Sequence, residues 1–357
     1  MMTLDALSPN YFTILDADHP AFRYVGRIDQ TDPKAPVLIY PGSYIEVFFS
    51  GDSIAFRIED DGKGGGNYVG YLIDGKEGSF FCRLREKDAV YIAQEDLQPG
   101  WHKLTLFKRT DGCHGYIVFK GICLPKGGQI SPVPAPARRI ECYGDSVTAG
   151  CVNMTYGMER QLDGPNQGEY DNAWYSYAAI LARKLGADIH NNAQGGTSLL
   201  DGYGFFDNGE GLVGMERMYT MMGYVAYCGP CTAWDFSRYS PQVVTIGIGQ
   251  NDGSTYADIA ADPKAKENWK AHYKAVLKGL RTQHPDAYIL LFTTVLMHAP
   301  IWDDVLFEIA EEMQDDRIIA YRVRGAGQIT PGHPRRREME AQAEDLYQWI
   351  QTLPIPW

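Results

Sequence analysis

Proline occupies every second position of the segment Ser131-Pro132-Val133-Pro134-Ala135-Pro136-Ala137, and the character of the sequence changes across it. Alternating prolines sustain neither a helix nor a strand ladder and favour an extended, stiff geometry. The chain has 357 residues, and single cores stop growing at roughly 250–300 residues, so two domains are expected. We therefore predict one domain over residues 1–130, a linker over 131–137 and a second domain over 138–357.

The first half of the chain is a succession of short strand-like runs. Between residues 37 and 124, segments rich in Val, Ile, Tyr and Phe, such as 44–49, 53–58 and 103–109, alternate with turn signals such as Ser50-Gly51-Asp52. These residue types pack well on a pleated surface. Many short strands at this spacing indicate an all-β sandwich.

After the linker, strand-like and helix-like segments alternate. Strands are expected at 139–143, 187–191, 241–248 and 288–296, and helices at 173–185, 269–283 and 334–353. Alternation of this kind is typical of parallel strands joined by crossover helices, hence of an α/β/α three-layer domain with a parallel sheet.

The charge balance disfavours some classes of partner. There are 33 Lys and Arg against 45 Asp and Glu, which gives a formal net charge of −12. Such a field repels nucleic acids and anionic lipid surfaces. The basic cluster Arg335-Arg336-Arg337 is too short for a binding stripe, and we predict that it is a solvated helix start.

Several features favour a cytoplasmic location. The first residues show no basic region, apolar core and cleavage site of a signal peptide. No apolar run approaches the ~18–20 residues of a membrane span. Seven cysteines do not suggest a secreted disulfide framework. No motif specifies the oligomeric state, and a homo-oligomer is compatible with the sequence.

Small and polar residues follow the expected strands, where open α/β sheets bind their ligands. The blocks are Gly144-Asp145-Ser146, Gly195-Gly196, Gly249-Gln250-Asn251-Asp252 and Gly332-His333-Pro334. Each block alone also fits an ordinary turn, loop or cap. Four of them in one order, all at one edge of the sheet, indicate a nucleophile, oxyanion donors and a base.

Together these blocks resemble those of the SGNH (GDSL-type) hydrolase superfamily. The resemblance implies that Ser146 is the nucleophile and His333 the general base. It also implies an oxyanion hole made by the backbone N–H groups of Ser146 and Gly195 and the side chain of Asn251. Spacing does not decide between Gly195 and Gly196, and we take Gly195. The resemblance implies neither a metal nor another cofactor.

One departure concerns the acid that orients the histidine. The family usually carries an aspartate two or three residues before it, where this chain has Pro331 and Thr330. Either a backbone carbonyl holds the ring or an acid arrives from elsewhere in the fold, and we expect the carbonyl. His298, which ends an apolar run, is a weaker alternative base and a candidate substrate contact.

The first half adds a second resemblance, to the jelly-roll-like domain of carbohydrate esterase family 2. The segments that carry it are Gly26-Arg27, Pro41-Gly42-Ser43, 48–52, Ile73-Asp74-Gly75, 97–102 and 107–110. That family implies deacetylation of acetylated xylo- or manno-oligosaccharides. Aromatic candidates for stacking on a sugar are Trp174, Trp234, Tyr256 and Trp302.

Alternative interpretations remain open. Another SGNH activity, such as a lipase, thioesterase or lysophospholipase, would need a broad apolar cleft. A non-catalytic carbohydrate-binding protein on the same scaffold would not need both Ser146 and His333. Cys228-Gly229-Pro230-Cys231 spells a redox motif, but no thioredoxin-like βαβ pattern surrounds it, and we interpret the two cysteines as loop residues.

Overall fold

The computed structural model describes residues 2–3, 11–60, 63–64, 66–82, 89–165, 168–296, 299–325 and 332–357. By the contacts within the chain, it divides into two compact units, Met1–Ala135 and Pro136–Trp357. Among the described residues, none of the helices combines the length and apolarity that crossing a membrane requires.

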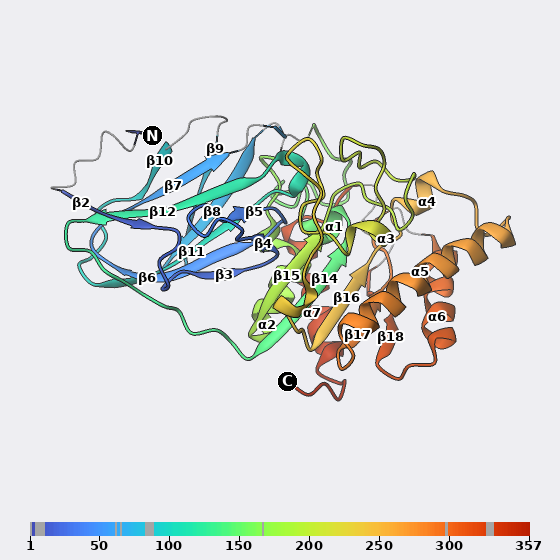
Figure 1. Ribbon diagram of the computed structural model, residues 1–357. Coiled ribbons are helices and arrows are strands. Elements are labelled where there is room, and N and C mark those ends of the chain that lie inside the picture. Colours follow the sequence, from blue (N-terminus) through green and yellow to red (C-terminus); the bar gives the residue numbers. More distant parts are fainter. Residues whose placement is uncertain are drawn as a thin grey trace. The chain divides into compact units, whose positions relative to one another are not determined.

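The first unit contains two antiparallel sheets (Figure 1). One sheet consists of β1 (Met2–Thr3), β10 (Ala89–Gln94), β7 (Ile54–Asp60), β12 (Ile117–Pro125), β5 (Val37–Leu38) and β4 (Ile28–Asp29), with β2 (Phe12–Asp16) beside β12. The other consists of β13 (Ile130–Ser131), β6 (Tyr44–Ser50), β11 (Trp101–Lys108), β8 (Asn67–Ile73) and β9 (Lys76–Cys82), with β3 (Arg23–Val25) beside β6.

Both sheets of this unit contribute side chains to one apolar core. Buried members include Val47 and Phe49 of β6, Phe56 of β7, Leu104 of β11 and Phe119 of β12. Alternate residues along such strands face the same side, so the alternating runs in the sequence bury one face of each sheet. The predicted all-β sandwich is confirmed. A 3-10 turn, η2 (Gly112–His114), connects β11 to β12.

The second unit is built on a five-stranded sheet in which every neighbouring pair is parallel. In spatial order the strands are β15 (Ala187–Ala193), β14 (Arg138–Gly144), β16 (Val243–Gly247), β17 (Tyr288–Phe292) and β18 (Ile318–Tyr321). All five residues of β17 are buried, as expected for a central strand covered on both faces.

Long helices cover both faces of this sheet (Figure 1). Helices α2 (Tyr177–Leu185) and α7 (Arg336–Ile350) pack against each other, as do α5 (Pro263–Gln283) and α6 (Pro300–Met313). The shorter elements are α1 (Ser146–Ala149), η3 (Ala173–Tyr175), α3 (Met215–Met218), η4 (Phe236–Arg238) and α4 (Asp252–Thr255). The predicted α/β/α arrangement with a parallel sheet is confirmed.

Some boundaries differ from those expected. Helix α5 begins six residues earlier than predicted, because Asp262 caps its N-terminus and Pro263 occupies the first helical turn. Helix α7 begins at Arg336 rather than at Pro334. Helix α6 and strand β18 were not predicted; β18 is only four residues long.

The strand order determines where a ligand can bind. Numbered along the chain, the strands run 2-1-3-4-5, the order of doubly wound sheets. The direction of winding reverses at the first strand, β14, so a crevice opens beyond the carboxyl ends of β14 and its neighbours. The blocks after Gly144 and Gly247 begin at this edge.

Candidate active site

The hydroxyl of Ser146 lies where the first strand of the sheet turns into a short helix. Strand β14 ends at Gly144, Asp145 caps helix α1, and Ser146 is the first residue of that helix. The Asp145 carboxylate accepts the backbone N–H of Val147 at 3.0 Å, which holds the turn. At the first helical position the N–H of Ser146 has no acceptor within the helix, so it can serve a ligand.

The imidazole of His333 lies beside that hydroxyl, although 187 residues separate the two in the chain. Its Nε2 is 2.8 Å from the Oγ of Ser146. Ser146 is 8% exposed and the His333 side chain 22% exposed. The structure thus brings the predicted nucleophile and base together, at a distance at which the hydroxyl can pass its proton to the ring during attack.

An aspartate that the sequence analysis did not single out holds the other side of the ring. Asp163 Oδ2 is 2.5 Å from His333 Nδ1, and the backbone N–H of His333 lies 3.2 Å from both carboxylate oxygens. The expectation that a backbone carbonyl orients the ring is therefore wrong. The carboxylate comes from a loop 170 residues earlier in the chain. It supplies the acid that neither Thr330 nor Pro331 carries.

The sequence contained only a faint signal for this aspartate. Asp163 precedes Gly164 and Pro165, and Asp-Gly followed by Pro is a common turn. Nothing in that pattern separates an acid that orients a histidine from an ordinary turn residue.

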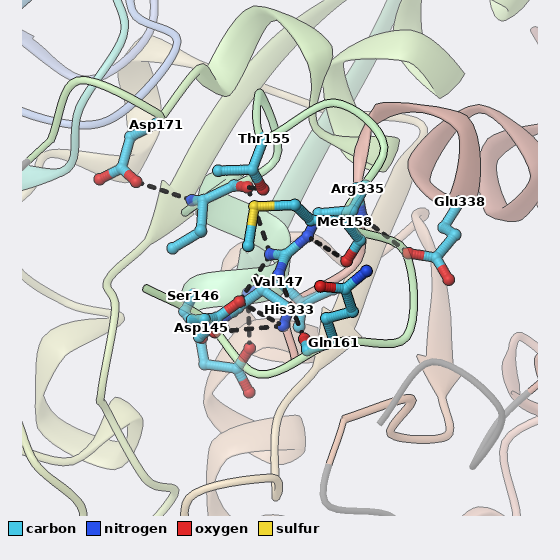
Figure 2. Close-up of polar contacts among 12 residues, drawn as sticks. Asp145, Ser146, Val147, Thr155, Met158, Gln161, Asp171, His333, Arg335 and Glu338 are labelled. Atoms are coloured by element: carbon cyan, nitrogen blue, oxygen red, sulfur yellow. Dashed lines mark hydrogen bonds and ion pairs between the residues drawn. The ribbon is translucent and has the colours of Figure 1, made fainter. Parts of the chain in front are cut away.

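The Asp163 carboxylate is paired with a buried cation. Arg335 Nη1 lies 2.6 Å from Asp163 Oδ1, and the Arg335 side chain is 1% exposed. The prediction that Arg335-Arg336-Arg337 is a solvated helix start is therefore wrong for Arg335. Its backbone N–H donates to Glu338 at 2.8 Å (Figure 2), so this arginine is the N-cap of α7 and its side chain points inward.

These contacts keep Asp163 ionised. Partial burial alone would raise the pKa of its carboxyl, but the hydrogen bonds from His333 and Arg335 outweigh that effect and lower the pKa to about 2. An ionised Asp163 accepts the proton on Nδ1 of His333. The Nε2 atom is then the unprotonated nitrogen and accepts the proton of Ser146.

Two of the expected oxyanion donors, Gly195 and Asn251, lie on neighbouring loops. The loop of Gly195 is tied to the end of β14, since Gln194 N–H donates to the Gly144 carbonyl at 3.1 Å. Asn251 Nδ2 donates one hydrogen to the Thr197 carbonyl at 2.7 Å. An amide nitrogen carries two hydrogens, so this bond orients the Asn251 amide and leaves a second N–H for a ligand.

Gln250 ties together the ends of three strands. Its Nε2 donates to Asp145 Oδ1 at 2.7 Å, and its Oε1 accepts the backbone N–H groups of Val295 and Leu296 at 3.2 and 2.6 Å. Burial raises the pKa of Asp145 to about 6, although hydrogen bonds from Gln250 and Val147 oppose the rise. The turn that carries Ser146 is therefore anchored through buried polar side chains.

The Asp252 carboxylate holds the loop that contains Gly195 and Leu199. Both of its oxygens accept the N–H of Leu199, at 2.9 and 3.0 Å, and one accepts Trp269 Nε1 at 2.9 Å. Burial raises its pKa to about 6, against these hydrogen bonds. The side chain thus links the block after β16 to the loop that contains Gly195.

Of the four aromatic candidates for sugar stacking, the three tryptophans are mostly buried, although Trp302 lines one pocket together with Tyr256. Trp174, Trp234 and Trp302 are 9%, 6% and 8% exposed. Tyr256 is half-buried, meets Tyr203 edge to face at 4.9 Å, and lines a pocket of about 340 Å³ beside α4. His298, the alternative base, lies outside the described residues.

The two cysteines of the redox-like motif occupy a loop, as interpreted from the sequence. Cys228 and Cys231 lie within turns and irregular backbone, and no disulfide joins them. Burial raises the pKa of the Cys231 thiol, which opposes the thiolate that redox chemistry needs.

One group of described side chains combines the ligand types of a metal site, and it belongs to the first unit. Asp111 Oδ1 lies 2.9 Å from Cys113 Sγ and 3.1 Å from His114 Nδ1. These atoms already hydrogen-bond to one another around the 3-10 turn η2. The chemistry of a serine–histidine pair needs no metal.

Comparison with known proteins places both halves of the chain in families. Residues 142–353 match the model of the GDSL-like lipase/acylhydrolase family, and residues 24–134 match that of the carbohydrate esterase 2 N-terminal domain. Cellulase/esterase CelE of Acetivibrio thermocellus is 33% identical over 276 residues, which are 77% of this chain. The chain spans 31% of the length of that relative.

Other relatives match over most of both chains. An acetylxylan esterase / glucomannan deacetylase of Cellvibrio japonicus is 22% identical over 336 residues, 92% of this chain and 88% of that protein. A family two carbohydrate esterase from Clostridium thermocellum, solved with cellohexaose, is 27% identical with a TM-score of 0.77, over 93% of this chain and 98% of that one. The chain therefore belongs to the GDSL-like lipase/acylhydrolase family, and it is a serine esterase with the two-domain architecture of family 2 carbohydrate esterases.

Proposed function

We propose that this enzyme removes acetyl groups from the hydroxyls of oligosaccharides, with Ser146 as nucleophile, His333 as general base and Asp163 as the acid that orients the base. The observation that carries the proposal is the hydrogen-bonded series from Ser146 Oγ to His333 Nε2 and from His333 Nδ1 to Asp163 Oδ2, at 2.8 and 2.5 Å. This is the order of contacts in a Ser-His-Asp triad.

In the first half-reaction, the Ser146 oxygen attacks the acetyl carbonyl carbon while its proton passes to His333 Nε2. The Asp163 carboxylate at Nδ1 stabilises the imidazolium that forms. His333 then gives the proton to the sugar oxygen as the ester bond breaks. The sugar leaves with its hydroxyl restored, and the acetyl group stays on Ser146.

In the second half-reaction, water takes the place of the sugar, and His333 removes its proton as it attacks the acetyl-enzyme. Acetate leaves and Ser146 recovers its proton. In both tetrahedral states the negative oxygen would accept hydrogen bonds from the backbone N–H groups of Ser146 and Gly195 and from Asn251 Nδ2. One such donor is worth about 10²–10³ in rate.

The choice of substrate is supported by charge and by relatedness. A net charge of −12 disfavours anionic ligands, and an acetylated oligosaccharide is neutral. The Cellvibrio japonicus relative is named for acetylxylan and glucomannan, and the Clostridium thermocellum structure contains cellohexaose. The cytoplasmic location stays a prediction.

Acetate release from a panel of acetylated xylo- and manno-oligosaccharides tests the proposal. Wild type should release acetate from at least one of them, and Ser146→Ala should lower kcat by at least about 10⁴-fold without a change in the thermal unfolding temperature. p-Nitrophenyl acetate should be cleaved faster than the octanoate. Preference for the octanoate would point to a lipase instead, and substantial activity in Ser146→Ala would refute the role of this serine.

A further inference from the structure

Arg335 is one of the largest fully buried side chains among the described residues. Its guanidinium lies among residues of the loop 152–165, which carries the triad acid Asp163 (Figure 2). Nε donates to the Met158 carbonyl at 3.2 Å, Nη2 to the Gln161 carbonyl at 3.3 Å, and Nη1 lies 3.4 Å from the Val152 carbonyl. Nη1 also contacts Asp163 Oδ1 at 2.6 Å. One rigid group therefore holds the loop backbone and the carboxylate at the same time.

The loop also packs directly on the segment that contains the base. A Cβ added to Gly332 would lie 1.9 Å from the Gln161 carbonyl oxygen, so only glycine permits this approach. His333, the next residue, donates its backbone N–H to Asp163. The carboxylate is thus held by two residues of the same segment, His333 and Arg335.

The start of the loop adopts a backbone conformation that needs external support. Val152 has φ of +56°, an unfavourable value for a β-branched residue. Its N–H donates to Asp171 at 2.7 Å, and its carbonyl accepts from Thr155 Oγ1 at 2.9 Å as well as facing Arg335. Such strain persists only where the surroundings enforce it, and the guanidinium is part of those surroundings.

We propose that Arg335 is a positioning residue for the ester hydrolysis: it occupies one carboxylate oxygen of Asp163 so that the other faces Nδ1 of His333. The inference rests on the proposed function, in which Asp163 orients the base. An acid two or three residues before the histidine would be placed by the chain itself. An acid 170 residues away depends on ordering its loop, which costs conformational entropy, and the arginine contacts offset part of that cost.

A double-mutant cycle separates this role from a merely structural one. Arg335→Met should lower kcat for p-nitrophenyl acetate by about 10²–10³-fold, less than the ~10⁴-fold expected when the orienting acid is replaced, and should leave KM within about threefold. In an Asp163→Asn background, Arg335→Met should lower kcat no further. Arg335→Lys, which keeps the charge without the planar fork, should recover about tenfold over the methionine variant.

Two matched variants accompany the cycle. Arg337→Met removes the exposed arginine of the same cluster and should leave kcat unchanged. Gly332→Ala leaves every charge in place but displaces the loop at Gln161, and it should also lose its effect when Asp163 is already Asn. Thermal unfolding is measured for every variant. If Arg335→Met folds poorly, Gly332→Ala tests the same positioning of Asp163 in its place.

The results distinguish failure of this inference from failure of the proposed function. Equal losses from Arg335→Met in both backgrounds, or no loss in either, would overturn the positioning role while leaving the esterase intact. If wild type hydrolyses no ester, the proposed function fails, and the Nδ1 proton of His333 still reports on the inference. In ¹⁵N-histidine-labelled protein that proton should be strongly deshielded in wild type and lost to exchange in Arg335→Met, and an unchanged signal would overturn the inference.

Discussion

Replacing Asp163 by asparagine should do more damage than the loss of one charge suggests. Arg335 Nη1 donates to the Oδ1 position, so an asparagine keeps its carbonyl oxygen there. Its NH₂ group then takes the Oδ2 position, 2.5 Å from His333 Nδ1 in the wild type. The amide donates to Nδ1, the imidazole proton moves to Nε2, and Nε2 can no longer accept the proton of Ser146.

The size of the effect follows from this inverted tautomer. Where the orienting aspartate of a serine–histidine–aspartate triad becomes asparagine and the geometry is kept, kcat falls about 10⁴-fold. That factor corresponds to about 5.5 kcal/mol of transition-state stabilisation. We expect the same magnitude in Asp163→Asn, with KM changed less than about threefold, because Asp163 lies on the side of the ring away from Ser146.

Steady-state hydrolysis of p-nitrophenyl acetate measures the loss. Asp235→Asn, which alters an exposed aspartate that caps the 3-10 turn η4, serves as the control and should retain wild-type kcat. A folded Asp163→Asn enzyme whose kcat lies within tenfold of wild type would refute the reasoning, because the ring would then be oriented by some other group.

Further outcomes concern the oxyanion and the response to pH. Asn251→Ala should lower kcat about 10²–10³-fold with little change in KM, and a rise in KM alone would count against an oxyanion role. The folded-state pKa of Asp163 is about 2, below its ordinary value near 4, so its ion pairs stabilise the protein above pH 4 and are lost as the pH falls from 4 to 2. The difference in unfolding temperature between wild type and Asp163→Asn should vanish over that range, and a constant difference would contradict the assignment. Asp252 has its pKa raised to about 6, so the native state binds the extra proton and stability should fall as the pH rises from 4 to 6. Asp145, whose pKa is also raised to about 6, contributes to the same slope. Asp252→Asn should therefore reduce the slope in urea unfolding by about half, and an unaltered slope would count against the raised pKa.

Most of the fold was predictable because its signals are local. The alternation of the runs around β6, β7 and β11 predicts half-buried antiparallel strands, and the fully apolar runs of β16 and β17 predict strands covered on both faces. Strand β18 was missed because four residues are too few to show a period. Helix α6 was missed although it has 14 residues.

The candidate site was predictable in part. Ser146, Gly195, Asn251 and His333 each end or follow an expected strand or precede a helix, and the order of the strands brings their ends to one edge. The residues next to His333 in the sequence favour a backbone carbonyl as its partner, which is wrong. The acid that contacts His333 lies 170 residues earlier in the chain.

The sequence by itself determined the two-domain architecture, the parallel sheet and the residue types needed for ester hydrolysis, since period, turn chemistry and strand-end polarity act over a few neighbouring residues. Only the tertiary structure decided that the Asp163 carboxylate lies against His333 and that Arg335 is buried while Arg337 is exposed. The loop from 152 to 165 has no periodic pattern that would reveal its partner. Its position depends on closure against a segment 170 residues away, where glycine at 332 permits contact and one arginine satisfies three carbonyls and a carboxylate.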